Sequence, residues 1–263
     1  MNNNDNKFRA GIVSVTFRQY EYKNLIRYIK ATDLSCVEWG SDIHVPYDNS
    51  HKAVDVAVEM QKNNLVSASY GSYYRLGNSD NTPEMFSMIL NNAKILGVPM
   101  IRVWGGTTGS SNLDEKDKQD IIKDVLNIAG TAKKENIKIS LEYHANTITD
   151  TIESTIKFIK EVRKQENGDN VYLYWQPNQN RDFFTNKAEL MLVCPYLSNV
   201  HVFAWETENR FALDFHREHW ENYINIIKNN SGKNHDFLLE FVKDDLVEQM
   251  TEDAKVLVEL INK

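Results

Sequence analysis

Apolar runs that are typical of β-strands alternate with amphipathic helical patterns along the whole chain. Eight short runs rich in apolar and β-branched residues predict strands at 10–16, 36–39, 65–70, 99–104, 137–142, 171–176, 199–205 and 236–242. Apolar residues at helical spacing predict helices at 20–31, 50–63, 82–96, 114–135, 150–165, 184–193, 217–229 and 245–261. Strands that alternate with helices in this way indicate a parallel sheet.

Eight strand-helix pairs within 263 residues favour one closed barrel. A (β/α)₈ TIM barrel needs about 250 residues, and no linker rich in Pro, Gly or Ser divides the chain. The alternative, a doubly wound open sheet, would carry a glycine fingerprint after its first strand, but the residues there are VSVTFRQYEY. We therefore predict an α/β fold with a single TIM barrel domain over 1–263.

Local patterns predict one helix start and the orientation of one strand. Asp150 and Glu153 have the spacing of a capping box, which predicts where the fifth helix begins. In the strand at 137–142, period-two alternation directs Ser140, Glu142 and the following His144 toward the barrel axis. Glu240 shares a face with Leu238 and Val242, and it is predicted to point into the same cavity.

Composition disfavours several classes of protein. The chain has a formal net charge of −7 and lacks a basic run that would follow a phosphate backbone, which disfavours nucleic-acid binding. The N-terminal residues are polar, and no segment approaches the roughly 18 apolar residues of a membrane span. Cys36 and Cys194 lie far apart in apolar stretches and are expected to be free thiols. These features predict a cytoplasmic protein without a nucleic-acid or membrane partner.

Four polar residues stand at the ends of predicted strands 5 to 8: Glu142, Gln176, His201 and Glu240. Each alone has an ordinary packing or solvent-facing interpretation. Their repetition on successive strands, at the end of a barrel where active sites form, favours a shared site. Carboxylate, amide and imidazole donors suit a divalent cation, for which we expect Mn²⁺ first, with Mg²⁺, Co²⁺ and Zn²⁺ as alternatives.

Further aromatic and basic residues are expected around the mouth of the barrel. Sugars stack their C–H faces on indole rings, so tryptophans near strand ends favour a carbohydrate ligand, although core packing is the alternative for each ring. No glycine-rich anion nest follows strands 7 and 8, which favours a non-phosphorylated sugar. The predicted substrate-binding residues are Trp39, Trp104, Trp175, Trp205, His44, His144, Arg75 and Arg210.

Six segments, in order, resemble the sugar phosphate isomerase/epimerase group of xylose-isomerase-like barrels. They are VEWGSDIHVP (37–46), IRVWGG (101–106), LEYHANTITDT (141–151), YWQPN (174–178), NVHVFAW (199–205) and LLEF (238–241). The resemblance implies a metal held by Glu142, His201 and Glu240, with Gln176 where the family has an Asp. An amide keeps a ligating oxygen but removes one negative charge, which lowers the expected metal affinity. Gln179 stands where the ketose epimerases of this group carry a His.

The resemblance also implies a reaction. In this group two Glu residues move a proton at the carbon next to a carbonyl, which predicts an isomerase or epimerase that uses Glu142 and Glu240 on a small carbohydrate. The alternatives are a metal-dependent lyase that cleaves oxidised 3-keto-glycosides by β-elimination and a degenerate sugar-binding barrel. An abasic-site endonuclease is disfavoured by the negative charge. Association into a homo-oligomer is left open.

Overall fold

Eight parallel strands form a closed barrel in the computed structural model, which describes residues 8–263. The strand order is β1-β10-β7-β6-β5-β4-β3-β2, so the predicted TIM barrel is confirmed. These strands are β1 (Phe8–Val13), β2 (Cys36–Gly40), β3 (Val66–Arg75), β4 (Met100–Trp104), β5 (Lys138–Glu142), β6 (Val171–Trp175), β7 (Leu197–Val202) and β10 (His235–Leu239). A small antiparallel hairpin, β8 (Trp205–Glu206) and β9 (Asn209–Arg210), follows β7.

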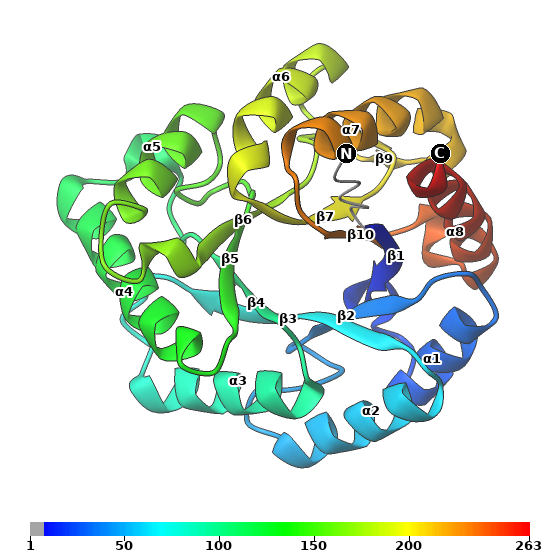
Figure 1. The fold of residues 1–263 in the computed structure, drawn as a ribbon, viewed down its shortest axis with the longest axis horizontal. Coiled ribbons are helices and arrows are strands. Elements are labelled where there is room, and N and C mark those ends of the chain that lie inside the picture. The colour runs from blue at the N-terminus through cyan, green and yellow to red at the C-terminus, as the bar shows by residue number, and fades with distance from the viewer. Residues whose placement is uncertain (1–7) are drawn as a thin grey trace, which may run out of the picture. The chain divides into compact units, whose positions relative to one another are not determined.

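Each predicted helix is present, with ends that differ by a few residues (Figure 1). The helices are α1 (Tyr22–Lys30), α2 (Ser50–Lys62), α3 (Pro83–Leu96), α4 (Glu115–Lys133), α5 (Ile152–Val162), α6 (Phe183–Val193), α7 (Arg217–Asn230) and α8 (Val247–Asn262). Within residues 8–263, none of them has both the length and the apolar character that a membrane crossing requires.

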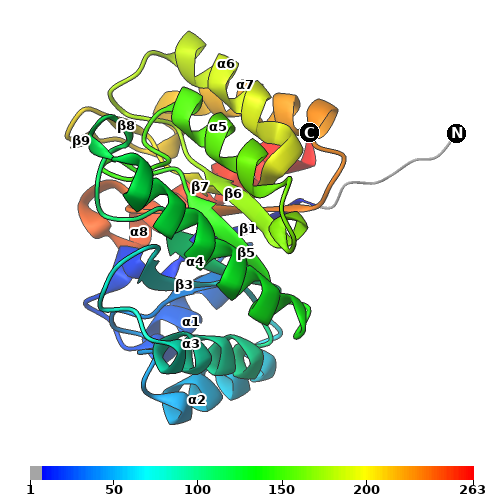
Figure 2. The same cartoon turned by 90° about the vertical axis from the view of Figure 1, so that its left-hand side faces the viewer.

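Backbone proximity groups the chain into two compact units. The first comprises residues up to Glu38, Val58–Val66 and Trp175–Lys263, and the second comprises Trp39–Ala57 and Ser67–Tyr174. In the first unit, β1 pairs with β10, and β10 pairs with β7 in a register that sets Leu238 beside His201. Helices α6 and α7 of this unit lie side by side (Figure 2).

In the second unit, strand register decides which side chains face the barrel interior. Glu142 in β5 is in register with Tyr174 in β6, and parallel neighbours in register share a face of the sheet. The Tyr174 hydroxyl lies 3.2 Å from Ser69 Oγ of β3, a strand that is not its neighbour in the barrel. A contact between non-adjacent strands crosses the interior, so Glu142 also faces inward, as its alternation predicted.

Several local predictions were wrong, including the ends of the first and last strands, where residues 14–17 form a 3-10 helix and β10 stops at Leu239. Thr151, not Asp150, is the N-cap of α5: its side chain accepts a hydrogen bond from the Ser154 backbone N–H, while Asp150 accepts one from the Ser110 N–H in another loop. The third strand continues to Arg75 through an irregular pairing after Gly71. The seventh strand ends at Val202, because the chain then turns into the β8–β9 hairpin, which the apolar pattern does not reveal.

A buried carboxyl group on α8 makes stability depend on pH. Asp253 accepts hydrogen bonds from the Leu213 N–H and from Gln249 Nε2, each 2.8 Å long. Burial raises the pKa of Asp253 to about 6 in the folded protein, above about 3.9 for an unfolded chain. The carboxyl therefore stabilises the fold fully below about pH 4, and this contribution is lost as the pH rises through about 6.

We expect Asp253→Asn to keep both hydrogen bonds and remove this pH dependence. Relative to wild type, the free energy of unfolding of the variant should rise by ~1–3 kcal/mol between pH 4 and pH 7.5. Urea denaturation at a series of pH values measures it. The control is Asp55→Asn at an exposed position on α2. If the free energy of unfolding of Asp253→Asn changed with pH in parallel with that of wild type, the expectation would be contradicted.

Candidate metal centre

His201 lies at the middle of a buried polar cluster in the first unit. It is the penultimate residue of β7 and has no solvent exposure. Its Nδ1 atom is 3.0 Å from Gln176 Oε1 and 3.4 Å from Glu240 Oε2, and its Nε2 atom is 3.6 Å from Glu38 Oε1. The two nitrogens therefore face different groups: Nδ1 faces Gln176 and Glu240, and Nε2 faces Glu38.

The strands place these side chains together. Gln176 directly follows β6 and Glu240 directly follows β10, while Glu38 is the central residue of β2. The backbone N–H of Glu240 donates to the Val202 carbonyl at the end of β7. This hydrogen bond holds Glu240 next to His201 along the strand direction. Two buried carboxylates flanking one imidazole need a compensating positive charge.

Glu142 has a different partner in the second unit. It is the last residue of β5, and its Oε2 atom accepts a hydrogen bond from Arg102 Nη1 of β4. Both side chains are almost fully buried, so this ion pair is shielded from solvent. The guanidinium restricts the orientation of the Glu142 carboxylate.

Glu142, His201 and Glu240 form a group suited to a metal ion. All three are buried, and each offers one ligand atom that lies within 4.8 Å of the others. Two carboxylate oxygens and one imidazole nitrogen fit a divalent cation such as Mn²⁺, Mg²⁺, Co²⁺ or Zn²⁺. Gln176 is in direct contact with His201, so its amide oxygen belongs to the same surroundings.

Several of the predicted substrate-binding residues form a stack in the second unit. The rings of Trp104 and His144 are stacked with centroids 4.5 Å apart, and the Arg75 guanidinium lies 4.0 Å from the Trp104 centroid. Trp104 lies two residues after Arg102 in β4, so both side chains point to the interior face of the strand. His44, also buried, has its ring 5.9 Å from that of Trp39.

Trp205 and Arg210 come together in the first unit. The Arg210 guanidinium lies 5.0 Å from the ring centroids of both Trp205 and Phe241, and its Nη1 atom donates to Asp245 at 2.7 Å. Phe241 directly follows Glu240 and has a φ of 50°, a left-handed conformation that is costly for a bulky side chain. The arginine is thus held by two aromatic faces and a carboxylate.

Two tryptophans do not lie where the sequence suggested. Trp175 alternates with Tyr174 along β6 and points outward, where it packs on Trp220 and Tyr223 of α7. Trp39 similarly lies on the face of β2 opposite to Glu38 and is fully buried. The prediction that these two rings line the mouth is corrected: both have the packing role that alternation gives to an outward-facing strand residue.

Comparison with known proteins assigns the family. A family model described as a xylose isomerase-like TIM barrel matches residues 26–258. The chain belongs to this family. The solved structures that it resembles have low sequence identity and show the fold alone.

One relative and three structures illustrate the range of the xylose isomerase-like barrels. A 3-dehydroshikimate dehydratase of Bacillus anthracis is 23% identical over 160 residues, which are 59% of this chain and 55% of that protein, so the match spans about half of the relative. D-psicose 3-epimerase in the presence of D-fructose has a TM-score of 0.70 at 13% identity, covering 97% of this chain and 100% of the other.

The other two structures contain metals. A xylose isomerase-like barrel from Mycobacterium smegmatis in complex with magnesium has a TM-score of 0.73 at 13% identity and covers 97% of each chain. The IOLI protein with a zinc atom has a TM-score of 0.72 at 16% identity, covering 97% of this chain and 98% of the other.

Sequence reasoning missed Glu38 and Arg102. Each is a charged residue within an otherwise apolar strand, in the contexts CVEWG and MIRVW. A charge in that position is seldom buried without a partner, and this was the available signal. The partner of each comes from another strand, His201 for Glu38 and Glu142 for Arg102, and no pattern within one strand identifies it.

We expect Glu38→Gln to weaken metal binding without removing a ligand. The Glu38 carboxylate lies 3.6 Å from His201 Nε2, and its negative charge beside the site favours a bound cation. Mn²⁺ affinity, measured by titration calorimetry, should fall by roughly tenfold or more. Glu166→Gln, at an exposed position, is the matched control; equal affinities in the two variants would show that Glu38 does not act on His201.

Gln176→Glu should have the opposite effect. The substitution adds a negative charge next to His201 and preserves the length of the side chain, so Mn²⁺ affinity should rise by about tenfold or more. The same calorimetric titration measures it, with Gln61→Glu at an exposed site on α2 as control. Unchanged affinity would place Gln176 outside the set of ligands.

Proposed function

We propose that this chain is a metal-dependent enzyme that removes a proton from the carbon next to a carbonyl in a small sugar or sugar-like substrate. The leading outcome is isomerisation or epimerisation. The observation that supports it is the buried group of Glu142, His201 and Glu240, whose ligand atoms lie within 4.8 Å of one another. Membership of the xylose isomerase-like family supports the same class of chemistry.

In the proposed mechanism, two carboxylates exchange the proton. Glu142, oriented by Arg102, accepts it from the substrate carbon, and Glu240 returns a proton; the reverse direction exchanges the two roles. A bound divalent cation, with Mn²⁺ as our first choice, supplies positive charge that stabilises the oxygen on which negative charge develops. Glu142, Gln176, His201 and Glu240 would hold that cation.

The surroundings of the two carboxylates support different tasks for them. Glu142 has a guanidinium beside it, whereas Glu240 lies against the His201 imidazole. Acid and base groups that share a site need unlike environments so that one gives up a proton while the other accepts it. The substitution of either one should therefore stop proton transfer.

The proposed substrate is a carbohydrate without a phosphate group. Trp104, stacked with His144 and Arg75, supplies an aromatic face for the C–H groups of a sugar, and D-psicose 3-epimerase, a structure that this chain resembles, acts on a ketohexose. Trp205 and Arg210, with His44, are proposed as further contacts. The outward-facing Trp39 and Trp175 are not proposed as substrate contacts.

Elimination is the second candidate, and the curated relative favours it. That relative is a dehydratase, a class of enzyme that expels water after loss of a proton. The first step, proton removal next to a carbonyl, is the same in both reactions. Only the fate of the product distinguishes a rearranged sugar from an unsaturated one.

Hydrogen exchange with solvent tests the shared step without knowledge of the product. In D₂O with Mn²⁺, the wild-type protein should introduce deuterium at the carbon next to the carbonyl of a substrate, which NMR detects in a panel of ketohexoses, 3-keto-glycosides and 3-dehydroshikimate. Glu142→Gln and Glu240→Gln should each lower the exchange rate by about 100-fold or more.

Controls separate the candidates. Glu166→Gln should exchange as wild type, and a chelator should stop exchange, with recovery on addition of Mn²⁺. A rearranged sugar supports isomerisation or epimerisation, and an unsaturated product or released aglycone supports elimination. Sugar binding without any exchange in the panel would favour a degenerate sugar-binding barrel and refute the proposal.

A further inference from the structure

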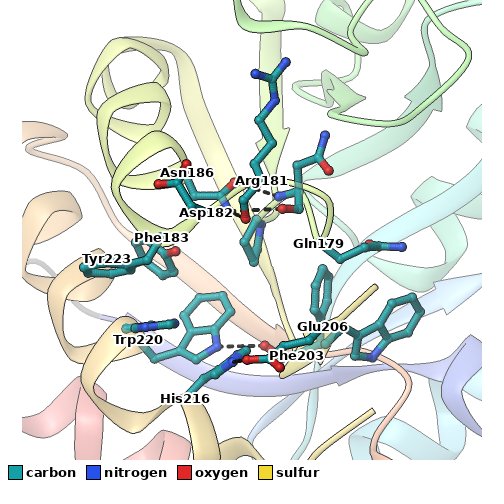
Figure 3. A pocket seen from close by; sticks show the side chains of 14 residues that line it. Gln179, Arg181, Asp182, Phe183, Asn186, Phe203, Glu206, His216, Trp220 and Tyr223 are labelled. Carbon is teal, nitrogen blue, oxygen red and sulfur yellow. Dashed lines mark hydrogen bonds and ion pairs between the residues drawn. The ribbon is translucent and has the colours of Figure 1, made fainter. Parts of the chain in front are cut away.

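A cavity lies within the first unit (Figure 3). Its volume is about 260 Å³, and its walls come from the loop after β6, the segment after β7 and helices α6 and α7. Pro177 in its wall directly follows Gln176, and Phe203 is two residues beyond His201. The cavity is therefore built on the same chain segments as two of the candidate metal ligands.

Seven of the fourteen lining residues carry an aromatic or imidazole ring. Phe183 and His219 are stacked at 4.3 Å with an interplanar angle of 14°, and Phe203 and Trp205 have centroids 5.0 Å apart. Tyr223 packs edge-on against Trp220 and also contacts Phe183, so these rings form a continuous lining.

Some polar groups of the lining hold the wall together. The Asn186 side chain accepts a hydrogen bond from the Asn178 N–H and donates to the Asn178 and Arg181 carbonyls. Asp182 caps the N-terminus of α6, and Trp220 Nε1 donates to the Phe203 carbonyl at 2.8 Å. These bonds fix the loop after β6 and the segment after β7 in place, so the cavity is preformed.

Three other polar side chains of the lining form no hydrogen bond within residues 8–263. They are Gln179, His219 and Tyr223, which come from the loop after β6 and from α7. Tyr223 is only 3% exposed and lines the cavity with a hydroxyl that no side chain among the described residues engages. A ligand with a hydroxyl offers these three side chains a hydrogen-bond partner inside the cavity.

We propose that this cavity binds a planar aromatic group that carries a hydroxyl. Aromatic walls favour a flat ring, and an apolar cavity of about 150 Å³ is already large enough to bind benzene. A phenolic hydroxyl both donates and accepts, as do the groups on Gln179, His219 and Tyr223.

The charge of the lining favours a neutral ligand. Burial lowers the pKa of His219, with a smaller contribution from His216 in the same direction. The imidazole is thus neutral at pH 7, with one nitrogen to donate and one to accept. Arg181 adds one positive charge to the lining, and Asp182 and Glu206, which is 3.3 Å from His216, add two negative charges that disfavour an anion.

The position of the cavity extends the proposed function. If the group of Glu142, His201 and Glu240 acts on a sugar, an aromatic substituent of that sugar would enter this cavity. The substrate class would then be aryl glycosides. This last step rests on the proposed function. Binding of the aromatic group itself does not.

Titration calorimetry with phenol tests the binding site directly. Phenol should bind the wild-type protein, and cyclohexanol, which has the hydroxyl but no flat ring, should bind at least about tenfold more weakly. Tyr223→Phe removes one hydroxyl and keeps the ring packing, and it should weaken phenol binding by about fivefold to tenfold. The control is Tyr28→Phe on α1, outside the cavity.

A further variant separates this proposal from the proposed function. Glu240→Gln should bind phenol as wild type does, even though it loses solvent exchange. If exchange is absent in wild type but phenol binding responds to Tyr223→Phe, the cavity stands and the proposed reaction fails. The proposal is overturned by no phenol binding at millimolar concentration, by equal affinity for cyclohexanol, or by equal phenol affinity in wild type and Tyr223→Phe.

Discussion

The site depends on the contacts of one buried imidazole. His201 has Gln176 and Glu240 beside Nδ1 and Glu38 beside Nε2, and His201 and the two carboxylates are buried. Buried carboxylates are unfavourable unless positive charge compensates them, which either a protonated histidine or a bound cation provides. A cation bound here would therefore add to the stability of β2 and β7, which carry Glu38 and His201, and of the chain directly after β10, which carries Glu240.

The two glutamates of the proposed reaction are positioned by different means. Glu142 is fixed by an ion pair with Arg102 from the neighbouring strand, and Glu240 by a backbone hydrogen bond to Val202 and the contact with His201. Phe241, in a strained left-handed conformation directly after Glu240, closes against Arg210 and Trp205. Strain of this kind persists only where surrounding contacts enforce it, and it is frequent at functional sites.

Aromatic residues divide into groups with separate roles because strands alternate. Trp104 lies two residues after the inward-facing Arg102 in β4, so it faces the same side of the strand. Its ring stacks with His144 and lies beside the Arg75 guanidinium. Trp39 and Trp175 each lie next to an inward-facing residue of their strand, and they pack outward. The cavity beside α7 uses yet another set, with Trp205 and Trp220 in its wall. A count of tryptophans near strand ends does not separate these roles, but the parity of each residue along its strand does.

The sequence by itself determined the order of the strands and helices, the closed barrel, and three residues of the metal-suited group, because two-residue and 3.6-residue periodicities report which face of an element is buried. Chain position alone also placed these residues at the carboxyl ends of strands, where barrel sites form. Tertiary structure alone decided that Glu38 faces His201, that Arg102 pairs with Glu142, and that Tyr223, His219 and Gln179 line one cavity. Those pairings join residues far apart in the chain, and they follow from strand register and helix packing, which no local pattern encodes.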